Sequence, residues 1–142
     1  PDMANAIIYA KDRGVVVVVS AGNNGAAGVT IPGCMSPALT VGATDNGVLA
    51  LFSGRGISVD ITAPGVGVYS TWLDNSYMSL SGTSSATPVV AGVIALMKYK
   101  NPSASAFDIE RVLLKTAKKV QEKDITDAET LLVNAHAAVR QI

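Results

Sequence analysis

Five consecutive valines, residues 15–19, constrain the fold of this chain more than any other feature. A strand with one face in water alternates apolar and polar residues, whereas this run shows no alternation, so both of its faces should be covered. Covered strands of this kind are typical of the centre of a parallel sheet in an α/β protein. The chain has 142 residues and is 49% hydrophobic, which is enough for one domain with a buried core. We therefore expect one compact α/β unit.

The remaining pattern predicts helices and short strands around this sheet. Apolar residues at helical spacing predict helices near 2–10, 84–100, 105–117 and 133–142. Short β-rich segments separated by turn residues predict strands at 38–44, 48–53, 59–65, 66–72 and 76–82. The third helix should bury Phe107, Ile109, Val112, Leu113 and Ala117. The polar residues 118–130 should form a loop.

Composition excludes several classes of partner. Eleven basic and eleven acidic residues give no net charge, and no basic run is present, so we expect neither nucleic acid nor an anionic membrane surface as a partner. No stretch approaches the ~18–20 apolar residues of a membrane span, and the N-terminus lacks the order of a signal peptide. Cys34 is the only cysteine, which excludes an internal disulfide and a CxxC pair, and it should be a small core residue.

Three short segments each admit a structural and a functional interpretation. The turn SAGNNG, residues 20–25, follows the valine strand, where ligands of α/β sheets bind, yet Asn and Gly are also ordinary turn formers. The segment GTSSATP, residues 82–88, opens a helix, where a serine can act as a cap or as a nucleophile. The segment ITAPG, residues 61–65, is by itself only a strand end and a turn.

In this order the three segments resemble those of the subtilisin-like serine proteases (subtilases, peptidase family S8). The nucleophile motif of that family is commonly Gly-Thr-Ser-Met-Ala-(Thr/Ser)-Pro-His-Val-(Ala/Ser)-Gly, and residues 82–92 here read GTSSATPVVAG. The departures, Ser85 and Val89, fall on positions that do not carry the reaction. The resemblance covers nearly all of residues 1–142, as the C-terminal half of a catalytic domain. It implies a three-layer fold, with a mostly parallel twisted sheet and helices on both faces.

The resemblance also implies roles for individual residues. Ser84 would be the nucleophile, and its own N–H would help to bind the oxyanion of the intermediate. Asn23 would be the side-chain donor of that oxyanion hole, and Thr83 would add a more distant dipole. The substrate pocket would be walled by Ser20, Ala21 and Gly22, with Thr30 near its base, and these small side chains favour apolar or modest-sized substrate residues.

One possible cation site and no chemical cofactor follow from the resemblance. Asp60 and the backbone around Gly33 correspond to a weak cation site of some relatives, although the second acid of that site is Ser58 here. A structural calcium ion is therefore possible at Asp60, and it is the only metal site that we consider. The resemblance favours a secreted protein, although other members of the family act inside cells.

A serine nucleophile needs a base and an orienting acid, and neither family motif is in this sequence. The only histidine, His136, lies in the closing helix, where we expect a structural role. Lys98 shares the helix of Ser84, but fourteen residues at ~1.5 Å per residue place it about 21 Å away. Lys115 and Lys118 should lie on a solvated face. We expect the acid and base to come from outside this chain.

Two further interpretations remain from other classes. The chain could be a non-catalytic subtilase relative that serves as a binding or regulatory module, although an intact set of Ser84, Thr83 and Asn23 argues against this. An unrelated α/β hydrolase is disfavoured because its Gly-x-Ser-x-Gly turn does not match residues 82–86. A central valine strand also needs neighbours on both edges, so we expect association with the N-terminal half of the protease or self-association.

Overall fold

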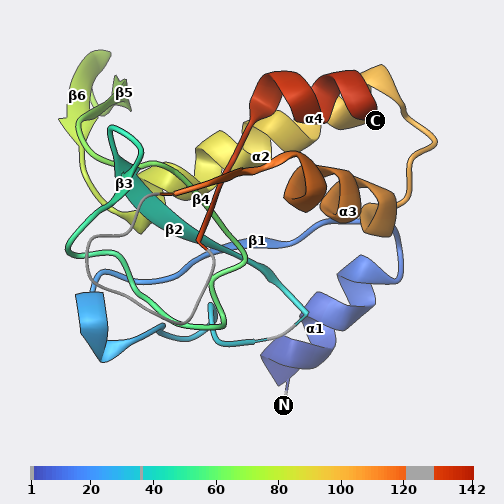
Figure 1. Cartoon of the computed structure of the whole chain (residues 1–142), viewed down its shortest axis with the longest axis horizontal. Coiled ribbons are helices and arrows are strands. Elements are labelled where there is room, and N and C mark those ends of the chain that lie inside the picture. The colour runs from blue at the N-terminus through green and yellow to red at the C-terminus, as the bar shows by residue number, and fades with distance from the viewer. Residues whose placement is uncertain (1, 36, 121–129) are drawn as a thin grey trace.

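The structure is a computed structural model that describes residues 2–35, 37–120 and 130–142. Its helices are α1 (Asp2–Lys11), α2 (Thr83–Lys100), α3 (Ala106–Thr116) and α4 (Ala135–Gln141), with a 3₁₀ turn η1 (Gly25–Ala27). Its strands are β1 (Val18–Ser20), β2 (Leu39–Asp45), β3 (Val48–Leu49), β4 (Ile61–Pro64), β5 (Val68–Trp72), β6 (Ser76–Leu80), β7 (Lys118–Lys119) and β8 (Leu131–Leu132). Figure 1 shows their arrangement.

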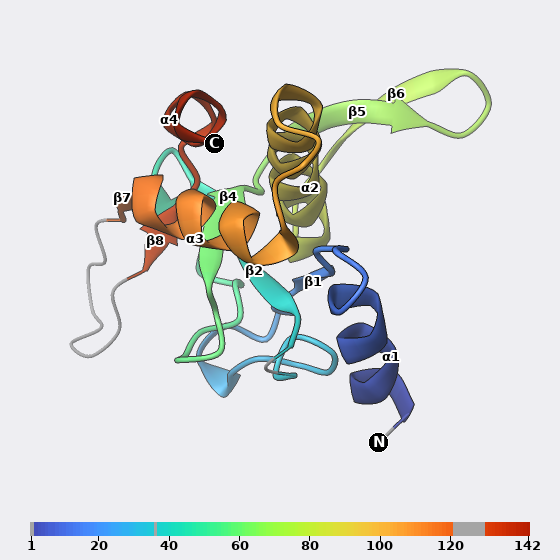
Figure 2. The ribbon, with the colours of Figure 1, turned by 90° about the vertical axis from the view of Figure 1, so that its right-hand side faces the viewer.

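The main sheet is mostly parallel and has the order β1-β2-β4-β8-β7. The pairs β1–β2, β2–β4 and β4–β8 are parallel, whereas β3 joins β2 and β7 joins β8 in antiparallel fashion. Helices α2, α3 and α4 gather on one side of this sheet, while η1 and the long loops lie on the other side (Figure 2). The expected α/β class and mostly parallel sheet are confirmed.

The core lies between the sheet and α2. Val41, Ala43 and Ile61 of the sheet are fully buried with Ala86 and Val90 of the helix. Small side chains at the C-terminal end of β2 and at the start of α2 let the helix approach the strands closely, and α2 contacts β1, β2 and β4. The first turn of α2 is thereby held at the carboxyl ends of the parallel strands.

The valine run differs from the expectation of a central strand covered on both faces. Only Val18–Ser20 is a strand, and its residues are half-buried. Within the described residues β1 pairs with β2 alone and forms one edge of the sheet. Apolar character predicts that a strand can be covered, but it does not supply the neighbouring segment that covers it.

Three smaller expectations are also corrected. Phe107 is 69% exposed, because it lies two residues before the buried Ile109 and so points away from the core face of α3. Cys34 is exposed rather than part of the core. The polar segment 118–130 is not wholly a loop, since its first residues pair as β7 with β8, and its residues 121–129 lie outside the described part.

Helix boundaries follow local capping chemistry. α2 ends before Asn101-Pro102, because the residue that precedes a proline is disfavoured in the helical conformation and Asn101 is not helical. The hydroxyl of Ser105 accepts a hydrogen bond from the Asp108 N–H at 3.0 Å and so caps α3, and the side chain of Asn134 caps α4 in the same way. In the described parts of the chain, no helix combines the length and apolar character that a bilayer span requires.

Candidate active site

Ser84 is the second residue of α2 and its side chain is exposed at the carboxyl end of the sheet. The N–H groups of a first helical turn have no partners within the helix, and the helix dipole makes this end positive. The Ser84 hydroxyl forms no hydrogen bond with any described residue. A nucleophile in this position remains accessible to another molecule.

The amide of Asn23 is oriented by Thr83, the residue before Ser84. Its Oδ1 atom accepts hydrogen bonds from both the backbone N–H and the hydroxyl of Thr83, each at 2.9 Å. These two donors occupy the oxygen, so the NH₂ group is the end of the amide that remains to donate. The geometry at Gly82 places this NH₂ group beside the helix start, since a Cβ added there would lie 3.4 Å from Asn23 Nδ2 and 3.8 Å from Ser84 N. The Asn23 NH₂ group and the Ser84 N–H therefore lie near each other at the start of α2.

The Thr83 hydroxyl also ties the turn after β1 to the start of α2. It accepts a hydrogen bond from the Gly22 N–H at 3.2 Å while it donates to Asn23. Thr83 is fully buried. In this structure the threonine acts as a positioning residue, because it fixes the amide of Asn23 and the backbone of Gly22 at once.

The predicted wall residues are brought together by a loop that folds back on β1. The Thr30 N–H donates to Ala21 O at 3.0 Å, and a side chain at position 22 would collide with the Thr30 hydroxyl. Gly22 has φ +92°, which a residue with a side chain adopts only under strain. Ser20 ends β1 directly before this turn. The four residues expected to form one pocket are thus neighbours.

Two glycines that the sequence analysis did not assign to the site support it. Gly54 donates its N–H to Gly22 O at 2.8 Å, and a Cβ at this position would lie 2.6 Å from Ala21 O. Gly65 accepts a hydrogen bond from the Gly82 N–H at 2.8 Å, and a Cβ there would lie 2.6 Å from the Ala43 side chain. The Pro-Gly turn of ITAPG therefore allows β4 to end against the turn that precedes Ser84. In the sequence, a glycine directly after a predicted strand end is the feature that could have indicated the role of Gly65.

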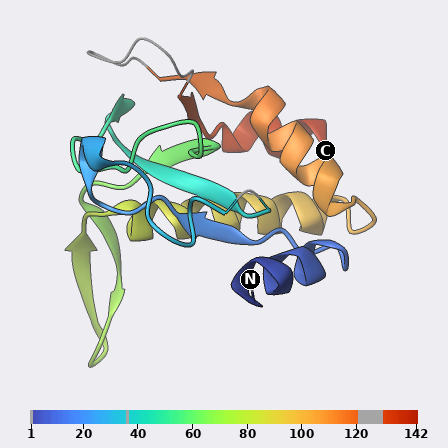
Figure 3. The ribbon, with the colours of Figure 1, turned by 90° about the horizontal axis from the view of Figure 1, so that it is seen from below.

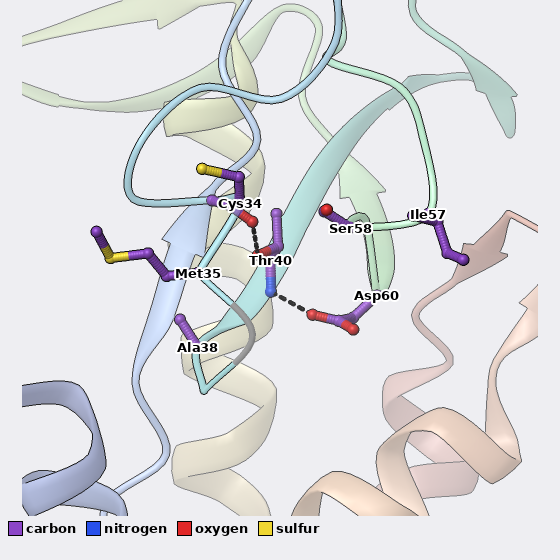
Figure 4. A pocket seen from close by; sticks show the side chains of 8 residues that line it. Cys34, Met35, Ala38, Thr40, Ile57, Ser58 and Asp60 are labelled. Carbon is purple, nitrogen blue, oxygen red and sulfur yellow. Dashed lines mark hydrogen bonds between the residues drawn. The ribbon is translucent and has the colours of Figure 1, made fainter. Parts of the chain in front are cut away.

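The candidate cation site lies at the opposite end of β2, in a cavity of about 170 Å³ (Figure 4). Asp60 Oδ2 accepts the Thr40 N–H at 2.7 Å, and the Thr40 hydroxyl donates to Gly33 O at 2.7 Å. Desolvation by burial raises the pKa of Asp60, although the hydrogen bond from Thr40 acts in the other direction. The cavity is lined by Gly33, Cys34, Met35, Ala38, Thr40, Ile57, Ser58 and Asp60.

These residues fit a calcium ion poorly. Calcium takes six to eight oxygen ligands, usually with several carboxylates, whereas Asp60 is the only carboxylate that lines this cavity. Its Oδ2 atom and the Gly33 carbonyl both already accept hydrogen bonds from Thr40. Across the described residues, no three His, Cys, Asp or Glu side chains are grouped so that they could hold a metal ion.

The basic residues considered as partners of Ser84 lie away from it. Lys100 Nζ donates to the carbonyls of Val139 and Arg140, so α4 and its exposed His136 lie near the far end of α2. Sixteen residues separate Ser84 from Lys100, which is about 24 Å along the helix. Lys98 Nζ donates to Ala104 O at 2.6 Å, and Lys115 and Lys118 are exposed. His136 and Lys98 therefore lie too far along α2 to act as a base for Ser84.

Comparison with known proteins agrees with this arrangement. The sequence model described as "Subtilase family" matches residues 1–131, which is most of the chain. The chain belongs to the subtilase family. This subtilase is 46% identical over 139 residues to M-protease of Shouchella clausii (strain KSM-K16), an alignment that covers 97% of this chain and 36% of that protein. It is 48% identical over 139 residues to alkaline elastase YaB of Bacillus sp. (strain YaB), with the same coverage of 97% and 36%.

Solved structures give the same assignment of fold. A protease from Pseudoalteromonas arctica PAMC 21717 superimposes on this subtilase with a TM-score of 0.87 and 34% sequence identity. The match covers 96% of this chain and 45% of that one. The subtilase chain therefore spans roughly a third to a half of the relatives that it matches.

Proposed function

We propose that this subtilase is part of a serine endopeptidase that hydrolyses peptide bonds through an acyl-enzyme on Ser84. The Ser84 oxygen attacks the scissile carbonyl and its proton passes to a base. The oxyanion that forms accepts hydrogen bonds from Asn23 Nδ2 and Ser84 N. The carbon–nitrogen bond then breaks, the amine leaves with the proton, and water hydrolyses the ester to regenerate the serine.

The observation that carries this proposal is the double hydrogen bond from Thr83 to Asn23 Oδ1. A turn former would not need its amide held in one orientation. Donors that are oriented before the reaction stabilise a developing oxyanion without reorganising during the step. The fixed amide therefore supports an oxyanion hole and disfavours an interpretation of residues 20–25 as a turn alone.

We propose that the base and the orienting acid are supplied from outside these 142 residues, by the N-terminal half of the protease. Two surfaces that no described residue covers support the proposal that another segment packs here. β1 has a free edge within the described residues. One face of α2 is exposed and apolar, and consists of Pro88, Ala91, Gly92, Ala95, Leu96 and Tyr99. A segment packed on this face would run alongside the helix that carries Ser84. Self-association over the same surfaces is the alternative.

Labelling with a fluorophosphonate, which reacts with activated serines, tests the function. We expect the full-length protein to be labelled and to cleave a peptide substrate, and we expect Ser84→Ala to abolish both. The Ser85→Ala variant is the matched control, since Ser85 is the neighbouring hydroxyl with no proposed role. A full-length protein that is folded but neither labelled nor active would favour the alternative function, a non-catalytic binding or regulatory module.

Three further expectations belong to the same proposal. The substrate is a protein or peptide, and the small residues around Gly22 support a preference for apolar or modest-sized side chains, as does the name of the relative called an alkaline elastase. The chemistry needs no cofactor, and the poor fit at Asp60 argues against a tightly bound calcium ion there. We also propose that the protein is secreted, and that neither nucleic acid nor a membrane is its partner.

A further inference from the structure

The hairpin of β5 and β6 projects away from the body of the molecule (Figures 2 and 3). Its strands pair with each other over five residue pairs, from Val68↔Leu80 to Trp72↔Ser76, and they form a sheet separate from the main one. An isolated two-stranded hairpin is at best marginally stable in water. This hairpin therefore gains little from the core, and its side chains remain available to another molecule.

Both faces of the hairpin carry exposed apolar side chains. The pairing register places Trp72 and Met78 on one face, where they are 45% and 41% exposed. It places Tyr69 and Tyr77 on the other face, where they are 70% and 62% exposed and their rings stack with centroids 5.5 Å apart. Tyrosine and tryptophan offer large contact areas at a low cost in side-chain entropy, and they are enriched in protein-binding surfaces.

The hairpin is almost uncharged. Asp74, at its tip, is the one ionisable acid or base among residues 66–81 apart from the two tyrosines. A surface without lysine or arginine offers nothing to phosphates or to anionic lipid headgroups. The chemistry of this surface matches a neutral, apolar-rich polypeptide.

The hairpin is continuous with the nucleophile turn. β6 ends at Leu80, four residues before Ser84, and the Gly67 N–H donates to the Ser81 hydroxyl at 3.0 Å at the base of the hairpin. Residues 76–80 extend about 13 Å from this base, at the usual rise of a strand. A long chain bound at Ser84 can extend along this surface, whereas a tetrapeptide offers at most about 13 Å of extended chain and therefore far less contact with it.

We propose that the β5–β6 hairpin is an auxiliary docking surface for extended, apolar-rich polypeptide substrates, outside the site that holds the scissile bond. The inference rests on the proposed function. The four side chains Tyr69, Trp72, Tyr77 and Met78 hold a segment of the substrate next to the hairpin while another segment of the same chain lies at Ser84. Longer apolar substrates therefore bind more tightly than short ones.

The test compares two substrates and two surfaces in the full-length protein. The substrates are an elastin-like polypeptide and a tetrapeptide anilide, and the variants are Tyr69→Ser/Tyr77→Ser and, as a matched control, Phe107→Ser on α3. We expect the tyrosine variant to lower the ratio of kcat/KM for the polypeptide to kcat/KM for the tetrapeptide about tenfold, mainly through KM. We expect the control to leave that ratio unchanged.

Three results would overturn the proposal. An unchanged ratio would mean that the hairpin does not bind substrate. A large loss of thermal stability in the tyrosine variant would mean that the hairpin packs against the rest of the protein. A change of oligomeric state without a change of ratio would mean that the hairpin joins two copies of the chain.

A binding measurement separates this inference from the proposed hydrolysis. The Ser84→Ala protein should bind a dye-labelled elastin-like polypeptide in fluorescence anisotropy, and adding the two tyrosine substitutions should weaken this binding about tenfold. If the wild-type protein cleaves no peptide but this difference persists, the hydrolysis fails and the docking surface stands. If cleavage occurs and the difference is absent, the docking surface fails alone.

Discussion

Asn23 and Thr83 are sixty residues apart in the chain, and their side chains form one unit beside Ser84. The buried threonine uses both its N–H and its hydroxyl on the same amide oxygen. An amide with a bound oxygen has one orientation, so its NH₂ group is directed before any substrate arrives. This positioning supports the proposal that the amide binds the oxyanion.

The first prediction concerns this amide. Asn23→Ala should lower kcat of the full-length protein by about a hundred- to a thousandfold with little change in KM, a magnitude known for the corresponding donor of a subtilisin and adopted here. Thr83→Val should lower kcat less, since it removes one of the two hydrogen bonds to Oδ1 and leaves the Asn23 amide in place. Steady-state kinetics with a peptide anilide measures both. If Asn23→Ala instead raised KM by as large a factor as it lowered kcat, Asn23 would act in substrate binding.

The second prediction concerns the pH dependence of stability. Burial raises the pKa of Asp60 above its unfolded value of about 3.9. The folded state then binds the proton more tightly, so stability increases as the pH falls through the folded pKa and levels off below the unfolded one. Asp60→Asn should therefore raise the unfolding temperature at pH 7 and have a smaller effect below pH 4, as measured by calorimetry.

A calcium titration provides the control for Asp60. We expect added calcium to leave the unfolding temperatures of the wild-type protein and of Asp60→Asn equally unchanged. A rise for the wild-type protein alone would show that the carboxylate holds a cation, and it would contradict the poor fit described above.

Glycines allow the strands, loops and helix α2 to approach one another closely at the site. Gly65, the residue after β4, lies against Ala43, Ala86 and the Gly82 carbonyl, with no room for a methyl group. Gly54 and Gly22 bring two loops together in the same manner. The start of α2 can therefore lie directly on the carboxyl ends of the strands, which is where Ser84 is exposed.

The third prediction tests this close approach. Gly65→Ala should destabilise the protein by about 1–3 kcal/mol, because the added carbon overlaps backbone and core atoms that cannot move freely. Gly92→Ala in the 142-residue chain is the control, since nothing lies within 4 Å of a Cβ there and alanine favours a helix by roughly 0.5–1 kcal/mol. Denaturant unfolding measures both. Equal effects of the two substitutions would mean that close packing at Gly65 is unimportant.

The whole molecule presents surfaces that a self-sufficient domain would cover. Two of them are the free edge of β1 and the exposed apolar face of α2, whereas the projecting hairpin carries exposed apolar side chains outside the body of the molecule. The chain spans roughly a third to a half of its relatives, and the first two surfaces are where we propose that the remaining part of the protease packs. The hairpin differs from them because it extends away from the body.

The fourth prediction follows from the face of α2. If the N-terminal half of the protease packs on this face, Gly92→Ala should stabilise the 142-residue chain and destabilise the full-length protein. The reason is that the added carbon meets open space in one case and a packed helix face in the other. Thermal unfolding of both lengths, with and without the substitution, makes the comparison. Stabilisation at both lengths would mean that this face stays in water.

The helix start next to Ser84, the α/β class and most helix positions were predictable from the sequence because they depend on local properties. The helical spacing of Val90, Val93 and Met97 indicates the core face of α2 without any knowledge of its neighbours. The motif at the helix start places Ser84 where backbone N–H groups have no partner within the helix. Other features depend on contacts between distant segments of the chain. They are the hydrogen bonds between Asn23 and Thr83, the edge position of β1, the exposure of Phe107 and the separation of the hairpin from the main sheet. Residue patterns show which side chains can be buried, but only folding decides which partners reach them, and that is why the orientation of the Asn23 amide had to come from the structure.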